Sequence, residues 1–268
     1  MKVLVLSDLH VQHEAFTVPL TEADVVILAG GIFTSSVSAV QWAREQEAFQ
    51  TVKAVVYVPG VLEHWGAFPH SALEQMSEAA QGSNVHPLDR GELVISGVRF
   101  LGCTLWTDFS LKVKTENGFS SNPQRAKKLE QECMNQRWKV PRGEAHFIQD
   151  GIGQPLPLVE MSVWEHRASV SWLEEKLAEP FQGKTVVISH HAPHRNSVPP
   201  TLIDSWNAPS AANDLPEKFF SVPELWAHGN TSSNVLYQIK QCLVYSNARS
   251  QGSDRINQDF DPNRGVKI

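Results

Sequence analysis

Residues 3–10 read VLVLSDLH, an apolar run that ends in the triplet Asp8-Leu9-His10. Four consecutive apolar residues of this kind are typical of a short strand that is buried on both faces of a sheet. A carboxylate and an imidazole then follow at the carboxyl end of the strand, where open α/β sheets assemble their sites. Both groups are ligands of transition metals, so the stretch predicts the start of a metal site at a sheet edge.

Four later stretches repeat the pattern of an apolar run followed by a glycine-containing or polar loop. They read VVILAGGIF at 25–33, VVYVPGVLE at 55–63, VVISHHAP at 186–193 and LWAHGNTS at 225–232. Strands that alternate with helical stretches are typical of an α/β fold. The chain is therefore expected to present a series of strand-to-loop junctions.

In the order of its motifs and in the residues around them, this series resembles the calcineurin-like metallophosphoesterase family. Its members carry Asp-x-His, Gly-Asp, Gly-Asn-His-Glu, a His and Gly-His-x-His on five such loops around two metal ions. The resemblance extends from residue 1 to about residue 250. It implies one domain over residues 1–268, in which two packed mixed β-sheets are flanked by helices in a four-layer α/β/β/α sandwich. A chain of this length can bury the core of such a domain.

Matched motif by motif, the chain keeps some of the family's metal ligands and lacks others. The retained ligands are Asp8, His10 and His190. Residues that replace family groups are Gly31 for the bridging Asp, Val61 for the Asn ligand, Leu62 for the catalytic His, and Asn230 and Ser232 for the two His of the last motif. The resemblance thus implies that no catalytic residue of the family is kept.

The replacements suit a pocket without metals. Two divalent ions lie about 3.5–4 Å apart in dinuclear sites, and a bridging carboxylate offsets their repulsion. Gly31 provides no bridging carboxylate. Without a second carboxylate nearby, Asp8 is free to pair with a protonated His10. Val61 and Leu62 should make one wall drier than in the family. We expect no cofactor, or at most a single weakly bound Mn, Fe or Zn ion.

Other polar residues lie close to the degraded motifs and are candidates for the pocket. They are His64, His191, His194, His228 and Arg249. An alternative for each is a structural role, as a buried hydrogen-bonded His or an ordinary surface Arg.

Composition is consistent with a cytoplasmic protein. The apolar start is too short for a signal peptide, and no segment approaches the roughly 20 apolar residues of a membrane span. A net charge of −6 argues against general affinity for nucleic acid. Cys103, Cys133 and Cys242 are far apart and are expected to be buried reduced thiols.

The hydrophobic pattern predicts strands and helices in alternation. Strands are predicted at 3–6, 25–29, 54–58, 93–102, 185–189 and 242–246, and helices at 36–50, 70–81, 123–138 and 160–179. Residues 247–268 are predicted to form a final surface loop.

Residues 107–159 interrupt this alternation and are predicted to form a basic helical insertion. Between residues 112 and 142 it holds eight basic residues, Lys112, Lys114, Arg125, Lys127, Lys128, Arg137, Lys139 and Arg142. Such an insertion would be a lid that attracts an anionic ligand, or simply a solvated helical excursion. Trp106 and Trp138 bracket it and would stack a ring or pack the insertion onto the body.

Two classes of function stay open from the sequence. The first is a pseudo-phosphoesterase with a binding or regulatory role, whose partner is a protein or a phosphate-containing small molecule. The second is a phosphodiesterase with residual or altered activity that uses one metal ion. Whether the chain is an enzyme therefore depends on whether metal binds.

Overall fold

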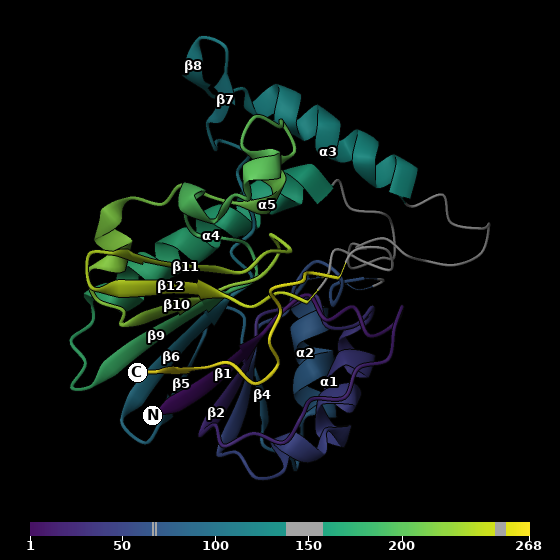
Figure 1. The fold of residues 1–268 in the computed structure, drawn as a ribbon, viewed down its shortest axis with the longest axis vertical. Helices are drawn as coiled ribbons and strands as arrows, with labels where there is room; N and C mark the ends of the chain where they lie inside the picture. The colour runs from purple at the N-terminus through teal and green to yellow at the C-terminus, as the bar shows by residue number, and fades with distance from the viewer. Residues whose placement is uncertain (66, 68, 138–157, 250–255) are drawn as a thin grey trace.

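The structure is a computed structural model, and it describes residues 1–65, 67, 69–137, 158–249 and 256–268. Their secondary structure is mixed α/β and is dominated by two large mixed sheets. Both termini lie side by side at one sheet edge (Figure 1), where the backbones of Met1 and Ile268 are hydrogen-bonded to each other. No helix among the described residues combines the length and apolar composition that crossing a membrane requires.

The first sheet contains the three strands predicted at 3–6, 25–29 and 54–58, and a fourth parallel strand, β4, that was not predicted. Its order is β13-β1-β2-β3-β4, and its strands are β1 (Lys2–Leu6), β2 (Val25–Leu28), β3 (Ala54–Tyr57), β4 (Val85–Pro87) and β13 (Gly265–Lys267). The edge strand β13 runs antiparallel to β1.

The second sheet has the order β11-β12-β10-β9-β6-β5. Its strands are β5 (Gly91–Ile95), β6 (Val98–Cys103), β9 (Lys184–Ser189), β10 (Leu225–Ala227), β11 (Val235–Ile239) and β12 (Cys242–Ser246). The four inner strands are parallel, and β5 and β11 are antiparallel edges. The loops after the inner strands of both sheets therefore gather at one end of the molecule.

The sheets pack face to face through a fully buried apolar layer. Val5 and Ile27 of the first sheet belong to the same cluster as Phe100, Val186 and Ile188 of the second. Because each sheet has both faces covered, its inner strands are apolar on both sides, which explains the near-continuous apolar runs of the sequence.

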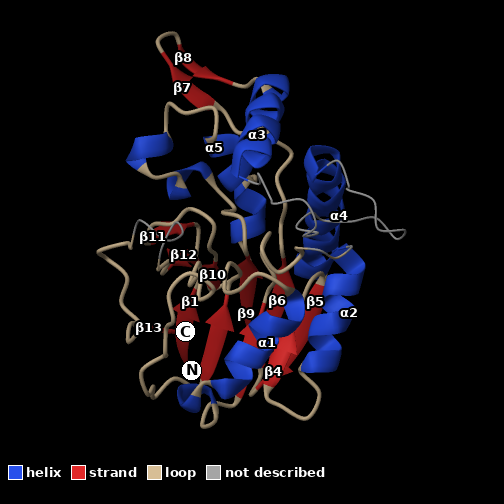
Figure 2. Cartoon of the chain, turned by 90° about the vertical axis from the view of Figure 1, so that its right-hand side faces the viewer, coloured by secondary structure: helices blue, strands red, loops and turns tan. Residues whose placement is uncertain are grey.

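Helices cover the outer faces of the sheets (Figure 2). On the first sheet lie α1 (Ser36–Glu45) and α2 (Pro69–Ala79), whose Val40 and Met76 pack against Leu28 and Tyr57. On the second lies α4 (Leu158–Ala178), which inserts Leu173 beside strand residues of that sheet. Each sheet thus has one face on the other sheet and one face on helices.

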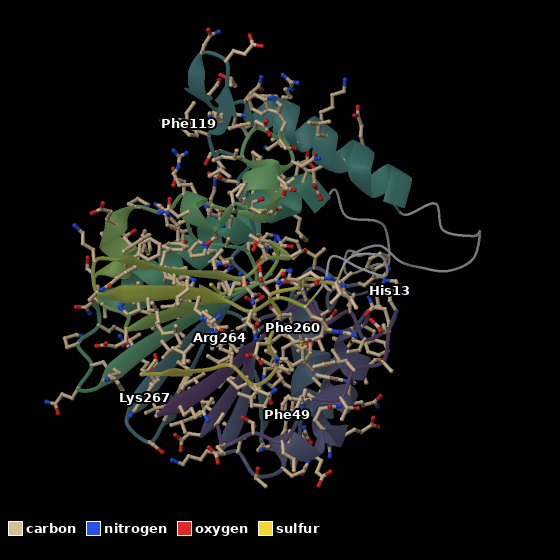
Figure 3. All side chains as sticks on the ribbon, in the orientation of Figure 1. His13, Phe49, Phe119, Phe260, Arg264 and Lys267 are labelled. Carbon is tan, nitrogen blue, oxygen red and sulfur yellow. The ribbon has the colours of Figure 1, made fainter. Side chains whose placement is uncertain are left out.

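A third group of elements lies beyond the carboxyl ends of the strands. It comprises the hairpin of β7 (Val113–Thr115) and β8 (Gly118–Ser120), α3 (Pro123–Arg137) and the short α5 (Ala208–Ala211). Phe119 projects from the hairpin at the end of the molecule farthest from the termini (Figure 3). Short 3-10 turns, η1 (Glu47–Phe49), η2 (Arg195–Ser197), η3 (Pro200–Leu202) and η4 (Glu217–Phe220), fill connections.

Three predicted elements need correction. The single strand predicted at 93–102 is the hairpin β5–β6, because Ser96 and Gly97 both have positive φ, as a tight two-residue turn requires. The helix predicted at 36–50 ends at Glu45, where Gln46 becomes extended. The surface loop predicted at 247–268 contains β13, which pairs with β1 although its sequence offers only one apolar residue, Val266.

The predicted insertion contains the β7–β8 hairpin and α3, and its limits at 107 and 159 stay a prediction. Phe109 and Ala126 pack against Val159 and Val163 of α4. Trp138, Lys139 and Arg142 lie outside the described residues, whereas Trp106 is buried in the body.

Cys103 and Cys242 are buried free thiols, as expected.

Candidate functional site

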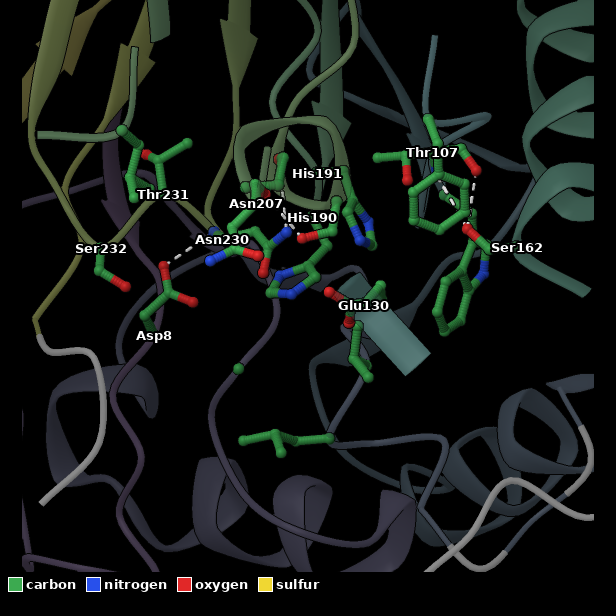
Figure 4. Close-up of a pocket in the computed structure, with 18 of the residues that line it drawn as sticks. Asp8, Thr107, Glu130, Ser162, His190, His191, Asn207, Asn230, Thr231 and Ser232 are labelled. Carbon is green, nitrogen blue, oxygen red and sulfur yellow. Dashed lines mark hydrogen bonds between the residues drawn. The ribbon is translucent and has the colours of Figure 1, made fainter. Parts of the chain in front are cut away.

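A cavity of about 250 Å³ opens where the loops of both sheets meet. Nine residues singled out from the sequence line it: Asp8, His10, Gly31, Val61, Leu62, His190, His191, Asn230 and Ser232. They come from the loops after β1, β2, β3, β9 and β10 (Figure 4). The five strand-to-loop junctions of the sequence thus converge on one site.

Asp8 is a buried carboxylate, with 3% of its surface exposed. It accepts a hydrogen bond of 2.9 Å from the backbone N–H of Asn230, which ties the loop after β1 to the loop after β10. Burial raises the pKa of Asp8 to about 6, and the neighbouring His190 opposes this shift. The carboxylate is therefore held at a cost in stability near neutral pH.

His190 is fixed between the two sheets. Its Nδ1 lies 2.9 Å from the carbonyl oxygen of Ala29, which can only accept, so Nδ1 carries a hydrogen and donates it. A Cβ atom on Gly60 would lie 2.7 Å from the imidazole ring. The ring therefore fits only because glycine occupies position 60.

The other two histidines of the cavity lose proton affinity through burial. Burial lowers the pKa of His10 to about 4, although Glu63 opposes the shift. Burial lowers the pKa of His191 well below its usual range, and the neighbouring His190 lowers it further. The Nδ1 of His191 faces the carbonyl oxygen of Thr104 at 3.2 Å, so this nitrogen also carries the hydrogen. Both rings are neutral near pH 7.

Gly31 lies beside Asp8 in a backbone conformation that disfavours any side chain. Its φ is +70°, and a Cβ atom there would lie 2.7 Å from Oδ1 of Asp8. The space beside Asp8 is therefore open because residue 31 is glycine.

Left-handed backbone occurs at several residues of the cavity loops. Asp8, His10, Asn230 and Ser232 have φ values of 50°, 47°, 63° and 52°. Residues other than glycine rarely adopt positive φ, and each such residue costs on the order of 1–3 kcal/mol unless its surroundings enforce it. Such strain typically clusters at sites that bind ligands or react.

Glu63 is a site residue to which the sequence reasoning assigned no role. Its carboxylate is fully buried and accepts hydrogen bonds from the N–H groups of Gly31, Ile32 and Gly60, at 3.2, 2.7 and 2.9 Å, and from the hydroxyl of Tyr57 at 2.8 Å. It therefore joins β3 and the loops after β2 and β3. The available signal was its place in the third strand-to-loop junction, directly after Val61 and Leu62.

Four residues predicted as possible pocket members do not line the cavity. Buried His64 contacts Trp106 and lies 3.4 Å from the Thr104 hydroxyl. His194 lies near Asp214. Buried His228 is hydrogen-bonded to Ser197. The guanidinium of Arg249 donates to the carbonyls of Leu9 and Glu14 and to the Glu14 carboxylate, so it anchors the loop after β1.

Ten further residues line the cavity, and all but Thr231 come from outside the five junctions. They are Trp106, Thr107, Phe109, Glu130, Ser162, Leu202, Asn207, Ser210, Ala211 and Thr231. Only Trp106 had been considered near a ligand from the sequence. Thr107 and Phe109 follow β6, whereas Glu130 and Ser162 are brought to the cavity by α3 and α4, and the remaining residues before Thr231 by the segment 200–211. No local pattern of the sequence indicates this placement.

The residues present do not match the donor set of a dinuclear metal centre. Among the described residues, no group of three or more His, Cys, Asp or Glu side chains is arranged to hold a metal ion. Gly31, Val61 and Leu62 have no side-chain donor, and Asn230 and Ser232 offer neutral oxygens in place of imidazole.

Comparison with known proteins identifies a fold neighbour. No family model matches the sequence, and no curated protein matches it. The crystal structure of phosphopantetheinyl hydrolase from Mycobacterium tuberculosis superposes with a TM-score of 0.63, over 92% of this chain and 88% of the other, at 14% sequence identity. At this identity the likeness shows the mixed α/β fold alone.

Proposed function

We propose that the chain has the calcineurin-like metallophosphoesterase fold, with its α/β/β/α sandwich, and has lost the family's metal-dependent hydrolysis. In this proposal it is a pseudo-phosphoesterase with a binding or regulatory role. The fold neighbour is named a phosphopantetheinyl hydrolase, and the superposition covers 92% of this chain. The motif order of the sequence supports the same family.

One observation carries the proposed loss of activity. The cavity and its strained loops are kept, yet the positions that would bridge and complete a dinuclear centre carry Gly31, Val61, Asn230 and Ser232. Leu62 replaces the histidine that would assist a leaving group, and its side chain transfers no proton. A cavity that keeps its strain without its donors is suited to binding rather than to hydrolysis.

Metal content and hydrolysis test this proposal together. Protein purified without chelator is analysed for Mn, Fe and Zn, and its hydrolysis of bis(p-nitrophenyl) phosphate is measured with and without added Mn²⁺. We expect less than one tightly bound metal per chain and a background rate. Two metals per chain, or turnover that Asp8→Ala abolishes, would overturn the proposal and favour the altered phosphodiesterase.

A further inference from the structure

Two large apolar side chains face solvent at the projecting end of the molecule. The β7–β8 hairpin is the outermost element at this end in both views (Figures 1 and 2). Phe119 of β8 is 54% exposed, and Ile203, which follows η3, is 41% exposed. Lys114 joins the two, because it is the cross-strand partner of Phe119 and its backbone N–H donates to the carbonyl of Ile203 at 3.0 Å. The two apolar residues therefore belong to one surface.

Basic residues surround these apolar side chains. Residues 112–128 hold five Lys or Arg and one acidic residue, Glu116, although the net charge of the chain is −6. The guanidinium of Arg195 lies over the ring of Phe119, 5.0 Å from its centroid, and donates to the carbonyl of Lys112 at 3.4 Å. The exposed aromatic ring is therefore held among basic groups.

The first turns of α3 belong to the same surface. The guanidinium of Arg125 lies over the ring of Trp206, 4.9 Å from its centroid, and Trp206 follows Ile203 by three residues. The exposed carboxylates of Glu116 and Asp204 oppose the positive charge of this surface, but the basic side chains outnumber them. The hairpin, the start of α3 and residues 203–206 thus form one basic surface with an apolar centre.

The lysines of this surface differ from most lysines of the body in their ion pairs. Five body lysines pair with carboxylates: Lys2, Lys53, Lys176, Lys218 and Lys240. By contrast, Lys112, Lys114 and Lys127 form no ion pair within the part of the chain that the structure describes. Their charges are not offset locally, so this end of the molecule attracts an anionic partner.

The basic residues of this surface do not face the cavity. None of the five Lys and Arg residues at 112–128 lines it, although Glu130 of α3 does. An anion that these residues attract therefore binds on the outer surface and not in the cavity.

The shape and the side chains of this surface favour a lipid bilayer over a nucleic acid. Single-stranded nucleic acids bind in basic grooves and stack their bases on aromatic rings. Here the surface projects from the body, the ring of Phe119 already has the Arg195 guanidinium over it, and Ile203 has no ring. The interface of a bilayer takes up aliphatic and aromatic side chains alike and places lysines at its anionic headgroups, and such a contact needs no membrane-spanning helix.

We propose that this projecting surface docks on an anionic lipid bilayer. Phe119 and Ile203 enter the boundary between the headgroups and the acyl chains, and Lys112 and Lys114 contact the anionic headgroups. This docking goes beyond the proposed function and does not depend on it, because it uses no residue that lines the cavity.

Sedimentation with lipid vesicles tests the docking. The full chain is mixed with vesicles of phosphatidylcholine alone, or of equal parts phosphatidylcholine and phosphatidylserine. We expect binding to the mixed vesicles that weakens with added salt, and binding to phosphatidylcholine alone that is weaker by about tenfold or more. No binding to the mixed vesicles, or equal binding to both kinds, would overturn the proposal.

Variants of the exposed aromatic residue test its insertion. Phe119→Ser should weaken binding to the mixed vesicles by about fivefold or more, because it removes an apolar side chain that the bilayer buries. Phe119→Trp should bind at least as tightly as the natural chain, since Trp is favoured at membrane interfaces. Trp164→Ser is the matched control, because Trp164 is 65% exposed on α4, and it should leave binding unchanged. Equal losses in Phe119→Ser and Trp164→Ser, or weaker binding of Phe119→Trp, would contradict insertion at residue 119.

A matched pair of double variants tests the lysines. Lys112→Gln with Lys114→Gln should weaken binding to the mixed vesicles about 25-fold, since each lysine near an anionic surface contributes about fivefold. Lys184→Gln with Lys267→Gln removes the same charge from exposed lysines elsewhere, and Lys267 lies far from Phe119 (Figure 3). This control should change binding by less than about twofold, because salt screens distant charges. Equal effects of the two double variants would show that net charge alone governs binding and would overturn the proposal.

Competition with other polyanions tests the choice of a bilayer. Poly(U) RNA and poly-glutamate represent a nucleic acid and an acidic protein, and each is compared with the mixed vesicles at an equal concentration of negative charge. We expect the mixed vesicles to bind more tightly than either polymer, because neither polymer takes up Phe119 and Ile203 in an apolar phase. Tighter binding of poly(U) or poly-glutamate would assign the surface to that class of partner and overturn the lipid proposal.

Discussion

The surroundings of Asp8 and Glu63 differ although both carboxylates are buried in loops of the first sheet. Glu63 is enclosed by four donors from β3 and the loops after β2 and β3. Asp8 lines the cavity, and burial raises its pKa to about 6. The Glu63 carboxylate holds the loops together. At Asp8, by contrast, burial opposes the charged form of the carboxylate.

Glu63 therefore serves the structure of the loops, whereas Asp8 serves the chemistry of the cavity. The third junction carries Glu63 beside Val61 and Leu62, so one loop combines a buried structural carboxylate with apolar side chains at the cavity. The phenol of Tyr57 agrees with this role, because burial and the adjacent Glu63 hold its pKa above the ordinary value and the hydroxyl stays a donor. The hydrogen bonds to Glu63 thus hold these loops in shape.

The largest effect is expected from removing Glu63. Glu63→Ala leaves three buried N–H groups without an acceptor and opens a void, so the free energy of unfolding should fall by about 3–5 kcal/mol. Urea denaturation measures this change. Tyr57→Phe removes one of the four donors and should cost only about 1 kcal/mol. A loss below about 1 kcal/mol in Glu63→Ala would contradict the structural role.

An effect of opposite sign is expected at Asp8. Its folded-state pKa of about 6 exceeds the ordinary 3.8, so the native protein holds this proton more tightly than the unfolded chain. Stability therefore falls as the pH rises through this window, and the penalty is complete above it. Asp8→Asn should raise the free energy of unfolding by about 2–3 kcal/mol at pH 7 and by less than about 1 kcal/mol at pH 4.

Asp8→Ala is the control for this comparison. Asn can still accept the hydrogen bond from the N–H of Asn230 and tolerates the positive φ of position 8, whereas Ala does neither well. We expect no comparable gain from Asp8→Ala. If Asp8→Asn raised the free energy of unfolding as much at pH 4 as at pH 7, the charged carboxylate of Asp8 would not be the cause of the lower stability.

The smallest effect is expected at the apolar wall. Val61 and Leu62 are partly exposed and line the cavity, so Val61→Asn with Leu62→His should change the free energy of unfolding by less than about 1 kcal/mol. Metal content should also stay below one ion per chain, because Gly31 still lacks a carboxylate. A tightly bound metal in this double variant would mean that the remaining donors nearly suffice.

The sequence by itself determined the inner strands and the convergence of their loops. The apolar runs 25–28 and 186–188 predict strands from the sequence alone, because burial on both faces of a sheet demands apolar residues at every position. Their loops meet because parallel strands end at the same edge. The positions of Asp8, His190 and Asn230 followed from that pattern.

Only the tertiary structure decided which other groups surround the cavity. β13 has too few apolar residues to be recognised alone and forms because the edge of β1 is available to pair. Glu130 and Phe109 reach the cavity through the packing of α3 and α4. Arg249 is drawn away from it by the carbonyls of Leu9 and Glu14. Such contacts join residues far apart in the chain, and local periodicity carries no information about them.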